Sequence, residues 1–247
     1  MNLIKQLALG LTLATGASAA STFSDILVSP LAIPDHDANG ILRALVVSGL
    51  AVNTRYTLDL SLNIQGTGYG GYVGDLYAYL AHQTPAGSYD MAVLLNRPGR
   101  SVLLPAGYDD GGLNITLSDR AAYDIHTYQS QFHELTGDGI LVGTWQPDRR
   151  LADPDTVVSG DERASATLDD LVNSLVTPDP NGTWYCFIAD METGGTMQLN
   201  SWSMTLAAVP EPANALALAG LLASGLLLRT RRRGCQRRRR AQQGREN

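Results

Sequence analysis

Cysteine is nearly absent from this chain, which has 2 cysteines in 247 residues. Cys186 lies in an apolar run, and Cys235 lies in an arginine-rich C-terminal stretch. A framework of internal disulfides is therefore excluded, and no cluster of His and Cys has the spacing of a zinc site. We expect Cys186 to be a buried, inert thiol.

Positive charge is scarce in the central part of the chain. Residues 20–206 contain 8 Lys and Arg against 22 Asp and Glu, a net charge of −14, whereas the whole chain has −6. This excludes non-specific binding to nucleic acid, which needs surplus Lys and Arg against phosphates. The acidity fits a cation-rich surface or bound calcium, and solubility is the simpler interpretation.

The motifs of common hydrolases are missing as well. None of the four histidines, His36, His82, His126 and His133, lies in a catalytic motif. There is no Gly-x-Ser-x-Gly elbow, and the His133-Glu134 pair lacks the second histidine that zinc proteases need. We therefore expect that the protein is not an enzyme.

What is present is a pattern of short strands. In residues 56–64, apolar side chains alternate with polar ones over nine positions, which is typical of a half-buried strand. Many short strands separated by glycine-rich turns favour an all-β sandwich or jelly roll. The other candidate strands are residues 41–48, 76–81, 91–95, 113–117, 184–189 and 199–206. Residues 164–176 are a candidate short helix, and residues 146–161 are predicted to form an exposed loop.

Both ends of the chain carry targeting signals. Lys5, an apolar core at residues 7–13 and the small residues Ala17-Ser18-Ala19 predict a secretory signal peptide over residues 1–19. At the other end, an apolar run over residues 213–228 is followed by a cluster of arginines. Counted from Ala207, this stretch is long enough to cross a bilayer once, and the arginines place the C-terminus in the cytoplasm.

The motif Pro210-Glu211-Pro212, the apolar span and the arginines together resemble the PEP-CTERM sorting signal of Gram-negative bacteria. The resemblance implies a sorting signal over residues 207–233, a basic cytoplasmic tail over 234–247, and cleavage near the motif by a membrane-bound exosortase. The alternative is an ordinary single-span anchor, which has no need of the Pro-Glu-Pro motif.

Five stretches of the body form a recognisable set: Asn181-Gly182-Thr183-Trp184, Leu199-Asn200-Ser201-Trp202, Gly74-Asp75-Leu76, Leu94-Leu95-Asn96-Arg97-Pro98-Gly99 and residues 114–122. Together they resemble the P domain, or P/Homo B domain, of proprotein convertases and secreted bacterial proteases. The resemblance is best over residues 30–206, within a domain at 20–206. It implies a jelly-roll β-sandwich of the kind that accompanies a subtilisin-like catalytic domain. Trp184 and Trp202 are expected in the core.

One candidate metal site stands out. Asp35, Asp37 and Asn39, followed by Gly40, reproduce the first half of an EF-hand loop, which predicts a calcium site. The second half is missing, because Val46 occupies the position of the bidentate Glu. Other oxygens would have to complete the shell, and the candidates are Asp190 and Asp109-Asp110. The alternative is an Asx-rich turn that leads into a strand.

These features predict an exported, non-catalytic β-sandwich protein of the cell envelope or extracellular matrix. Its expected partners are an exosortase-type enzyme, the membrane before processing, and a surface protein or polysaccharide. A second hypothesis is an accessory P domain that acts in a subtilisin-like serine protease system. A third is a hydrolase whose site is not visible in the sequence.

Overall fold

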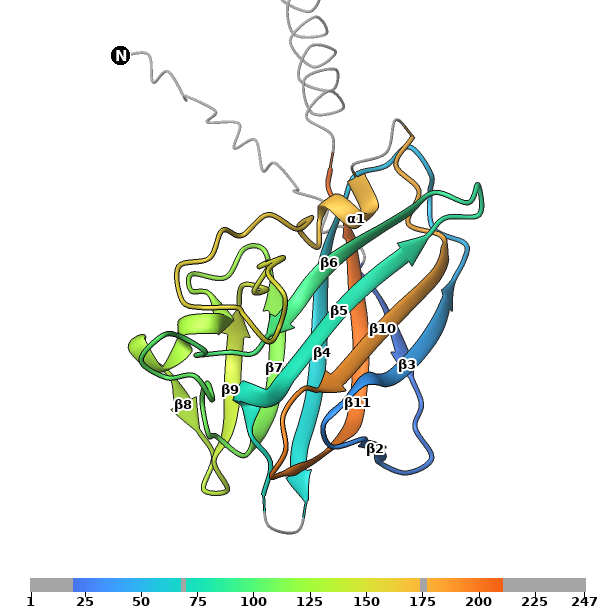
Figure 1. The fold of residues 1–247 in the computed structure, drawn as a ribbon. Helices are drawn as coiled ribbons and strands as arrows, with labels where there is room; N and C mark the ends of the chain where they lie inside the picture. Colours follow the sequence, from blue (N-terminus) through green and yellow to red (C-terminus); the bar gives the residue numbers. More distant parts are fainter. Residues whose placement is uncertain (1–19, 68–69, 174–176, 211–247) are drawn as a thin grey trace, which may run out of the picture. The chain divides into compact units, whose positions relative to one another are not determined.

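The computed structural model describes residues 20–67, 70–173 and 177–210, and in them the chain forms an all-β sandwich of two sheets (Figure 1). The larger, seven-stranded sheet has the order β1-β11-β4-β7-β9-β8, with β2 also paired to β11. Its strands are β1 (Ala20–Asp25), β2 (Leu31–Ile33), β4 (Tyr56–Thr67), β7 (Gly112–Ser118), β8 (Glu134–Leu135), β9 (Ile140–Trp145) and β11 (Thr196–Ala208).

The smaller sheet has four strands in the order β3-β10-β5-β6. They are β3 (Asp37–Val47), β5 (Leu76–Gln83), β6 (Tyr89–Asn96) and β10 (Gly182–Asp190). The helices are short: η1 (Val73–Asp75), η2 (Ile125–Ser130) and α1 (Asp170–Asn173). Among the described residues, no helix is long and apolar enough to span a membrane.

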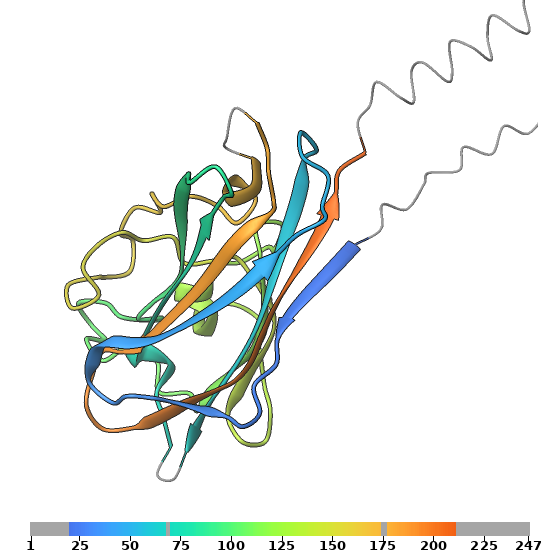
Figure 2. The ribbon, with the colours of Figure 1, turned by 90° about the vertical axis from the view of Figure 1, so that its right-hand side faces the viewer.

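The core lies between the two sheets, which Figure 2 shows on either side of the molecule. Strand β4 illustrates how the sequence builds it. The side chains of Leu58, Leu60, Leu62 and Ile64 are at most 1% exposed, while the polar residues between them point outward. Burying each of these aliphatic side chains stabilises the fold by roughly 1.5–3 kcal/mol.

The tryptophans of the last two strands both lie in this core. Trp184 on β10 and Trp202 on β11 come from opposite sheets and are almost fully buried. Each indole N–H has an acceptor: the carbonyl oxygen of Pro180 at 3.1 Å for Trp184, and the carboxylate of Asp25 at 3.0 Å for Trp202. The rings are therefore part of the core, as their positions in the strand pattern predict.

Each of the seven predicted strands corresponds to one in the structure, namely β3, β4, β5, β6, β7, β10 and β11. The strands β1, β2, β8 and β9 were not predicted. Within the predicted helix at 164–176, the described residues contain only the four-residue α1. The predicted loop at 146–161 is a loop in the structure, but it is exposed only in part, because Asp148, Arg150 and Val157 are buried.

The chain enters and leaves the sandwich at the same end. Ala20 pairs with Ala207 where β1 runs antiparallel to β11. Strand β11 continues to Ala208, two residues into the range predicted for the sorting signal. Pro210 is exposed and is the last described residue. The predicted signal peptide, Glu211 and Pro212, the apolar span and the basic tail lie outside the described residues.

Candidate functional site

The predicted metal-binding residues lie at the end of the sandwich farthest from Ala20 and Ala208. Asp190 ends β10 and pairs with Asp37, the first residue of β3, and with Leu76 at the start of β5. The thirteen residues of β11 separate the two ends of the molecule by roughly 40 Å. Any function of this end is therefore exerted away from the segment that leads to the sorting motif.

Three carboxylates, those of Asp75, Asp155 and Glu192, lie around the buried side chain of Arg97 at this end. Arg97 is 0% exposed, and its Nη2 lies 3.7 Å from Asp75 and 3.4 Å from Glu192. Its Nε donates to the carbonyl oxygen of Gly74 at 3.0 Å, and its Nη1 lies 3.7 Å from Asp155. Arg97 therefore supplies positive charge beside the buried Asp75, which lowers the cost of burying that carboxylate, whereas Glu192 and Asp155 are exposed.

Two buried aspartates at this end, Asp75 and Asp190, have pKa values well above the ordinary value for Asp. Burial raises the pKa of Asp75 to about 6, against the opposing effect of Arg97, and the charges of Glu192 and Asp35 raise it further. Burial likewise raises the pKa of Asp190 to about 7, and the charges of Asp75 and Asp35 add to this shift. Asp35, Asp75 and Asp190 therefore lie close enough to interact electrostatically.

The structure brings Asp35 toward Asp190 but gives Asp37 and Asn39 another role. The backbone N–H and the Nδ2 of Asn39 both donate to the same Asp37 oxygen, at 2.9 and 2.8 Å. This is the geometry of an Asx turn leading into β3. Asp110 is also engaged elsewhere, since it accepts hydrogen bonds from Tyr128 and Gln129.

Within residues 20–67, 70–173 and 177–210, no three His, Cys, Asp or Glu side chains are grouped so that they could hold a metal ion. The charge of Asp75, a residue that the sequence pattern did not single out as a metal ligand, raises the pKa of Asp190. Calcium at Asp35, Asp37 and Asn39, with Asp190, stays a prediction of the sequence.

Two of the histidines are buried, and both ring nitrogens of each lie within hydrogen-bonding distance of an oxygen atom. His82 lies between the carbonyl oxygens of Leu171 and Asn181, at 2.8 and 2.9 Å, and stacks on Trp184. His126 lies 2.8 Å from the carboxylate of Asp148, and its other nitrogen faces the carbonyl oxygen of Arg100 at 3.1 Å. In a catalytic triad, the histidine nitrogen that does not face the carboxylate faces the hydroxyl of the nucleophile. In His126 this nitrogen faces a backbone carbonyl oxygen instead.

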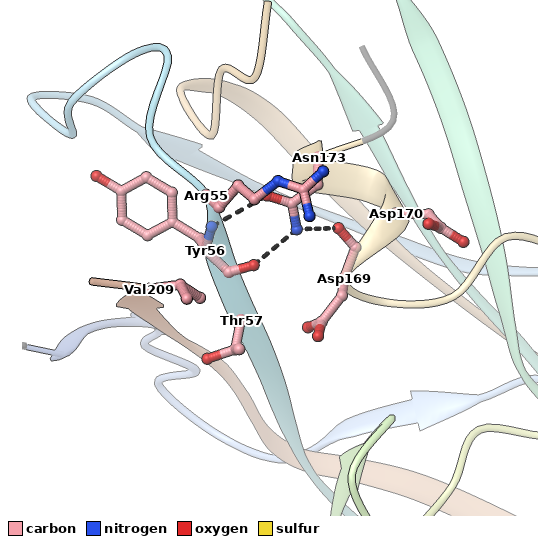
Figure 3. Close-up of a pocket in the computed structure, with 7 residues that line it drawn as sticks. All are labelled: Arg55, Tyr56, Thr57, Asp169, Asp170, Asn173 and Val209. Carbon is pink, nitrogen blue, oxygen red and sulfur yellow. Dashed lines mark hydrogen bonds between the residues drawn. The ribbon is translucent and has the colours of Figure 1, made fainter. Parts of the chain in front are cut away.

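At the opposite end, a pocket of about 280 Å³ lies beside the exit of the chain (Figure 3). Its walls come from residues 55–57, Asp169, Asp170, Asn173 and Val209. The side chain of Asn173 accepts a hydrogen bond from the N–H of Tyr56 at 3.0 Å and donates to its carbonyl oxygen at 2.7 Å.

These polar contacts serve the fold. Asp169 accepts a hydrogen bond from the N–H of Leu58 at 2.8 Å. Asp169 and Asn173 thus provide hydrogen-bond partners for the backbone at the start of β4. These residues of β4 have no partner in β7, because that pairing begins at Asp59. The N–H of Val209 donates to the carbonyl oxygen of Arg55 at 2.8 Å. The last backbone hydrogen bond of the sandwich is thus made one residue before Pro210.

Cys186 is buried as expected. It is 0% exposed on the inner face of β10, and burial raises the pKa of its thiol to about 12. A thiol in this state is a poor nucleophile and a poor metal ligand, because the thiolate is the reactive form.

No protein-family model matches the chain, and no curated protein matches it either. The resemblances to the P domain and to the PEP-CTERM signal therefore stay predictions from the sequence, whereas the β-sandwich is a feature of the structure.

Proposed function

We propose that this chain is an exported, non-catalytic β-sandwich protein of the cell envelope or extracellular matrix. In this proposal an exosortase-type enzyme sorts it at Pro210-Glu211-Pro212, and the apolar C-terminal segment anchors it in the membrane before processing. The sandwich then binds a surface protein or polysaccharide. The P-domain resemblance adds that the sandwich is a jelly roll.

The observation that carries the proposal is the place where the sandwich ends relative to the predicted sorting motif. The first described residue, Ala20, is already paired in β1, against Ala207 of β11. Strand β11 ends at Ala208, two residues before Pro210. Cleavage after Ala19 and near Pro210 would leave the described strands of the sandwich whole, which is what a protein processed at both ends requires.

The experiment follows the processing of the full chain in a Gram-negative host, with and without a co-expressed exosortase. An epitope is inserted at Gly137, in an exposed turn with open space around it. We expect a mature N-terminus at Ala20, an epitope that added protease reaches on intact cells, and exosortase-dependent shortening of the C-terminus. The readouts are N-terminal sequencing and the intact mass of the product.

The matched control is Glu211→Ala, which changes the sorting motif outside the sandwich. We expect this variant to be exported but to keep its C-terminal segment. An unprocessed N-terminus with an epitope protected from protease would contradict export. Equal shortening of the wild type and the variant would contradict sorting at the motif.

The second candidate is an accessory module in a subtilisin-like proteolysis system. It is favoured by the consecutive strands β10 and β11, which carry the two buried tryptophans in the stretches that resemble a P domain. The test is co-purification with a subtilisin-like protease encoded near this gene. A rise in the thermal midpoint of that protease on mixing would support the accessory role.

Calcium binding has its own test. The thermal midpoint of the full chain is measured in detergent with calcium and with a chelator. A rise with calcium that disappears in the double variant Asp35→Ala/Asp37→Ala would establish the site. The same midpoint under both conditions would exclude it.

A further inference from the structure

The outward side of the smaller sheet carries a continuous group of aromatic rings. Tyr77 and Tyr79 on β5 alternate with the buried residues Leu76, Ala78 and Leu80, so they point away from the core. Tyr185 and Phe187 do the same on β10. Figure 1 looks onto this side, because β3, β10, β5 and β6 lie in front of the larger sheet. We call it the outer aromatic face, defined by these four residues with Gln83 and Tyr89.

Strand register brings the rings together. Tyr79 pairs directly with Phe187, and their rings stack at 4.8 Å between centroids with an angle of 16°. The ring of Tyr77 lies 6.3 Å from each of the other two, in edge-to-face geometry. On the flanks, the hydroxyl of Tyr185 donates to Gln83 at 3.3 Å, and Gln83 pairs with Tyr89, which is 57% exposed.

The face is uncharged, although it belongs to an acidic domain. The outward positions from 42 to 46 on β3, from 183 to 187 on β10 and from 77 to 83 on β5 contain no Asp, Glu, Lys or Arg. A polyanion would be repelled by the net charge of −14 over residues 20–206, and so would a second copy of the domain. A cationic partner would find no carboxylate on the face to pair with. An uncharged face on an acidic domain therefore favours an uncharged binding partner.

The chemistry of the face matches a sugar polymer. Pyranose rings present C–H groups on their faces and hydroxyls on their rims, and aromatic rings attract C–H groups through their negative π-faces. Burial raises the pKa of Tyr77 and Tyr79, so their hydroxyls stay protonated and can donate hydrogen bonds. Gln83 adds an amide group beside the rings.

The platform is rigid, which limits the entropy lost on binding. Strands β5 and β10 are hydrogen-bonded on both sides, to β6 and β3 and to each other. The rings therefore stand on the two central strands of the sheet, and few side chains must be ordered when a ligand binds.

From these observations we propose that the outer aromatic face binds a neutral polysaccharide, with sugar rings against Tyr77, Tyr79 and Phe187. The hydroxyl of Tyr185 and the amide of Gln83 hydrogen-bond to sugar hydroxyls. The inference rests on the proposed function, since it names the partner class of the exported sandwich.

The test is native affinity electrophoresis of the full chain in detergent, through gels that contain hydroxyethylcellulose, glucomannan or dextran. Alginate serves as the acidic polysaccharide control. We expect retardation by at least one neutral polymer and none by alginate. In the double variant Tyr79→Ala/Phe187→Ala, the dissociation constant from the retardation series is expected to rise at least tenfold.

Two further variants separate binding from folding. Tyr79→Leu/Phe187→Leu keeps apolar side chains on the strands but removes the π-faces, so it should also lose binding while its thermal midpoint stays near that of the wild type. Tyr123→Ala/Phe132→Ala removes one exposed Tyr and one exposed Phe from elsewhere on the sandwich, and should bind as the wild type does.

Three results would overturn the inference: retardation by none of the neutral polymers, equal retardation of the double variants and the wild type, or stronger retardation by alginate. Concentration-dependent dimerisation that the Leu double variant abolishes would also overturn it, by assigning the face to self-association. Export and sorting are read out separately by N-terminal sequencing and protease access. A correctly sorted protein without polysaccharide binding would therefore refute this inference alone.

Discussion

At the scale of single residues, Asp75 and Asp190 link the stability of the sandwich to pH. Their pKa values of about 6 and about 7 lie above the value of about 3.9 for an unfolded Asp. Between pH 4 and pH 7 the folded state therefore binds more protons than the unfolded state. Its free energy of unfolding should fall as pH rises through this window, and the contribution of these groups should level off above pH 7.

Asp190→Asn tests this linkage, because the amide keeps the shape of the carboxyl but does not ionise. We expect the pH-dependent loss of stability, on the order of 3 kcal/mol for the pair, to be reduced by half or more. Denaturant unfolding at pH 5 and pH 8 measures it. The control Asp109→Asn changes an exposed carboxyl and should keep the wild-type slope. An unchanged slope in Asp190→Asn would show that this carboxyl is not responsible.

His82 holds two segments against the smaller sheet through backbone carbonyls. His82→Phe keeps a ring against Trp184 but removes the ring nitrogens that lie 2.8 and 2.9 Å from the carbonyl oxygens of Leu171 and Asn181. A neutral imidazole has one N–H and donates to only one of these oxygens, and a buried polar group that loses its partner costs about 1–3 kcal/mol, so we expect a loss of about 1–3 kcal/mol in the free energy of unfolding. His36→Asn, at an exposed position with φ of 51°, should change it by less than about 0.5 kcal/mol. Equal effects would contradict the role of His82.

At the scale of the strands, Gly40 shows how the close approach of two paired strands, β3 and β10, restricts a position to glycine. Gly40 has φ of 47°, and a Cβ there would lie 2.2 Å from the carbonyl oxygen of Ile188 on β10. Gly49 also has a positive φ, of 83°, but has open space around it. Gly40→Ala should therefore destabilise the protein by at least about 1 kcal/mol more than Gly49→Ala. Equal losses would mean that only the backbone conformation matters.

The connection that includes residues 146–165 is fastened to the core by paired charges. Asp148 accepts from Arg150 at 2.8 Å, lies 2.8 Å from His126 and accepts the N–H of Asn96 at 3.1 Å. Asp148→Asn removes the negative charge from between these groups. We expect a loss of about 3–5 kcal/mol and faster proteolysis within the connection. Asp138→Asn, which is exposed, serves as the control and should leave both unchanged.

This connection also shows why the prediction of an exposed loop is only partly confirmed. A stretch rich in Asp, Arg and Pro is typical of a solvated loop, because an unpaired charge is costly to bury. In the structure, Arg150 lies between Asp124 and Asp148, and the charges satisfy one another. The partners are 2 and 26 residues away in the sequence, and the distant one is not visible in a local pattern.

At the scale of the whole molecule, Asp25 joins the two sheets at one edge. Its carboxylate on β1 accepts from Arg43 on β3 at 2.7 and 3.0 Å and from Trp202 on β11 at 3.0 Å. The hydrogen bond from Arg43 is the main reason that the pKa of Asp25 is lowered. The strand nearest the predicted signal peptide thus helps to close the sandwich.

Asp25→Ala should cost about 2–3 kcal/mol, because the indole N–H of Trp202 loses its acceptor inside the protein. Arg120→Ala breaks a more exposed ion pair with Asp59 and Asp169 and should cost about 1 kcal/mol or less. Thermal and denaturant unfolding of both variants compare the two values. If the losses are equal, the bridge between the sheets contributes no more than a surface pair.

The sequence by itself determined the period-two pattern that makes β4 and its neighbours strands, the burial of Trp184 and Trp202, and the acidity of the body. These properties depend on residues a few positions apart, so a local pattern is enough to predict them. It also predicts targeting signals at both ends of the chain, and β11 extends two residues into the range predicted for the second of them.

Only the tertiary structure decided which strands pair and in what register. The pairing of β5 with β10 sets Asp75 close to Asp190 and stacks Tyr79 on Phe187, although each pair is more than 100 positions apart in the chain. The tertiary structure also shows that the Asp37 carboxylate accepts two hydrogen bonds from Asn39 in an Asx turn. A strand pattern shows which side chains share a face, but the partner of that face depends on long-range pairing and on the closure of the core.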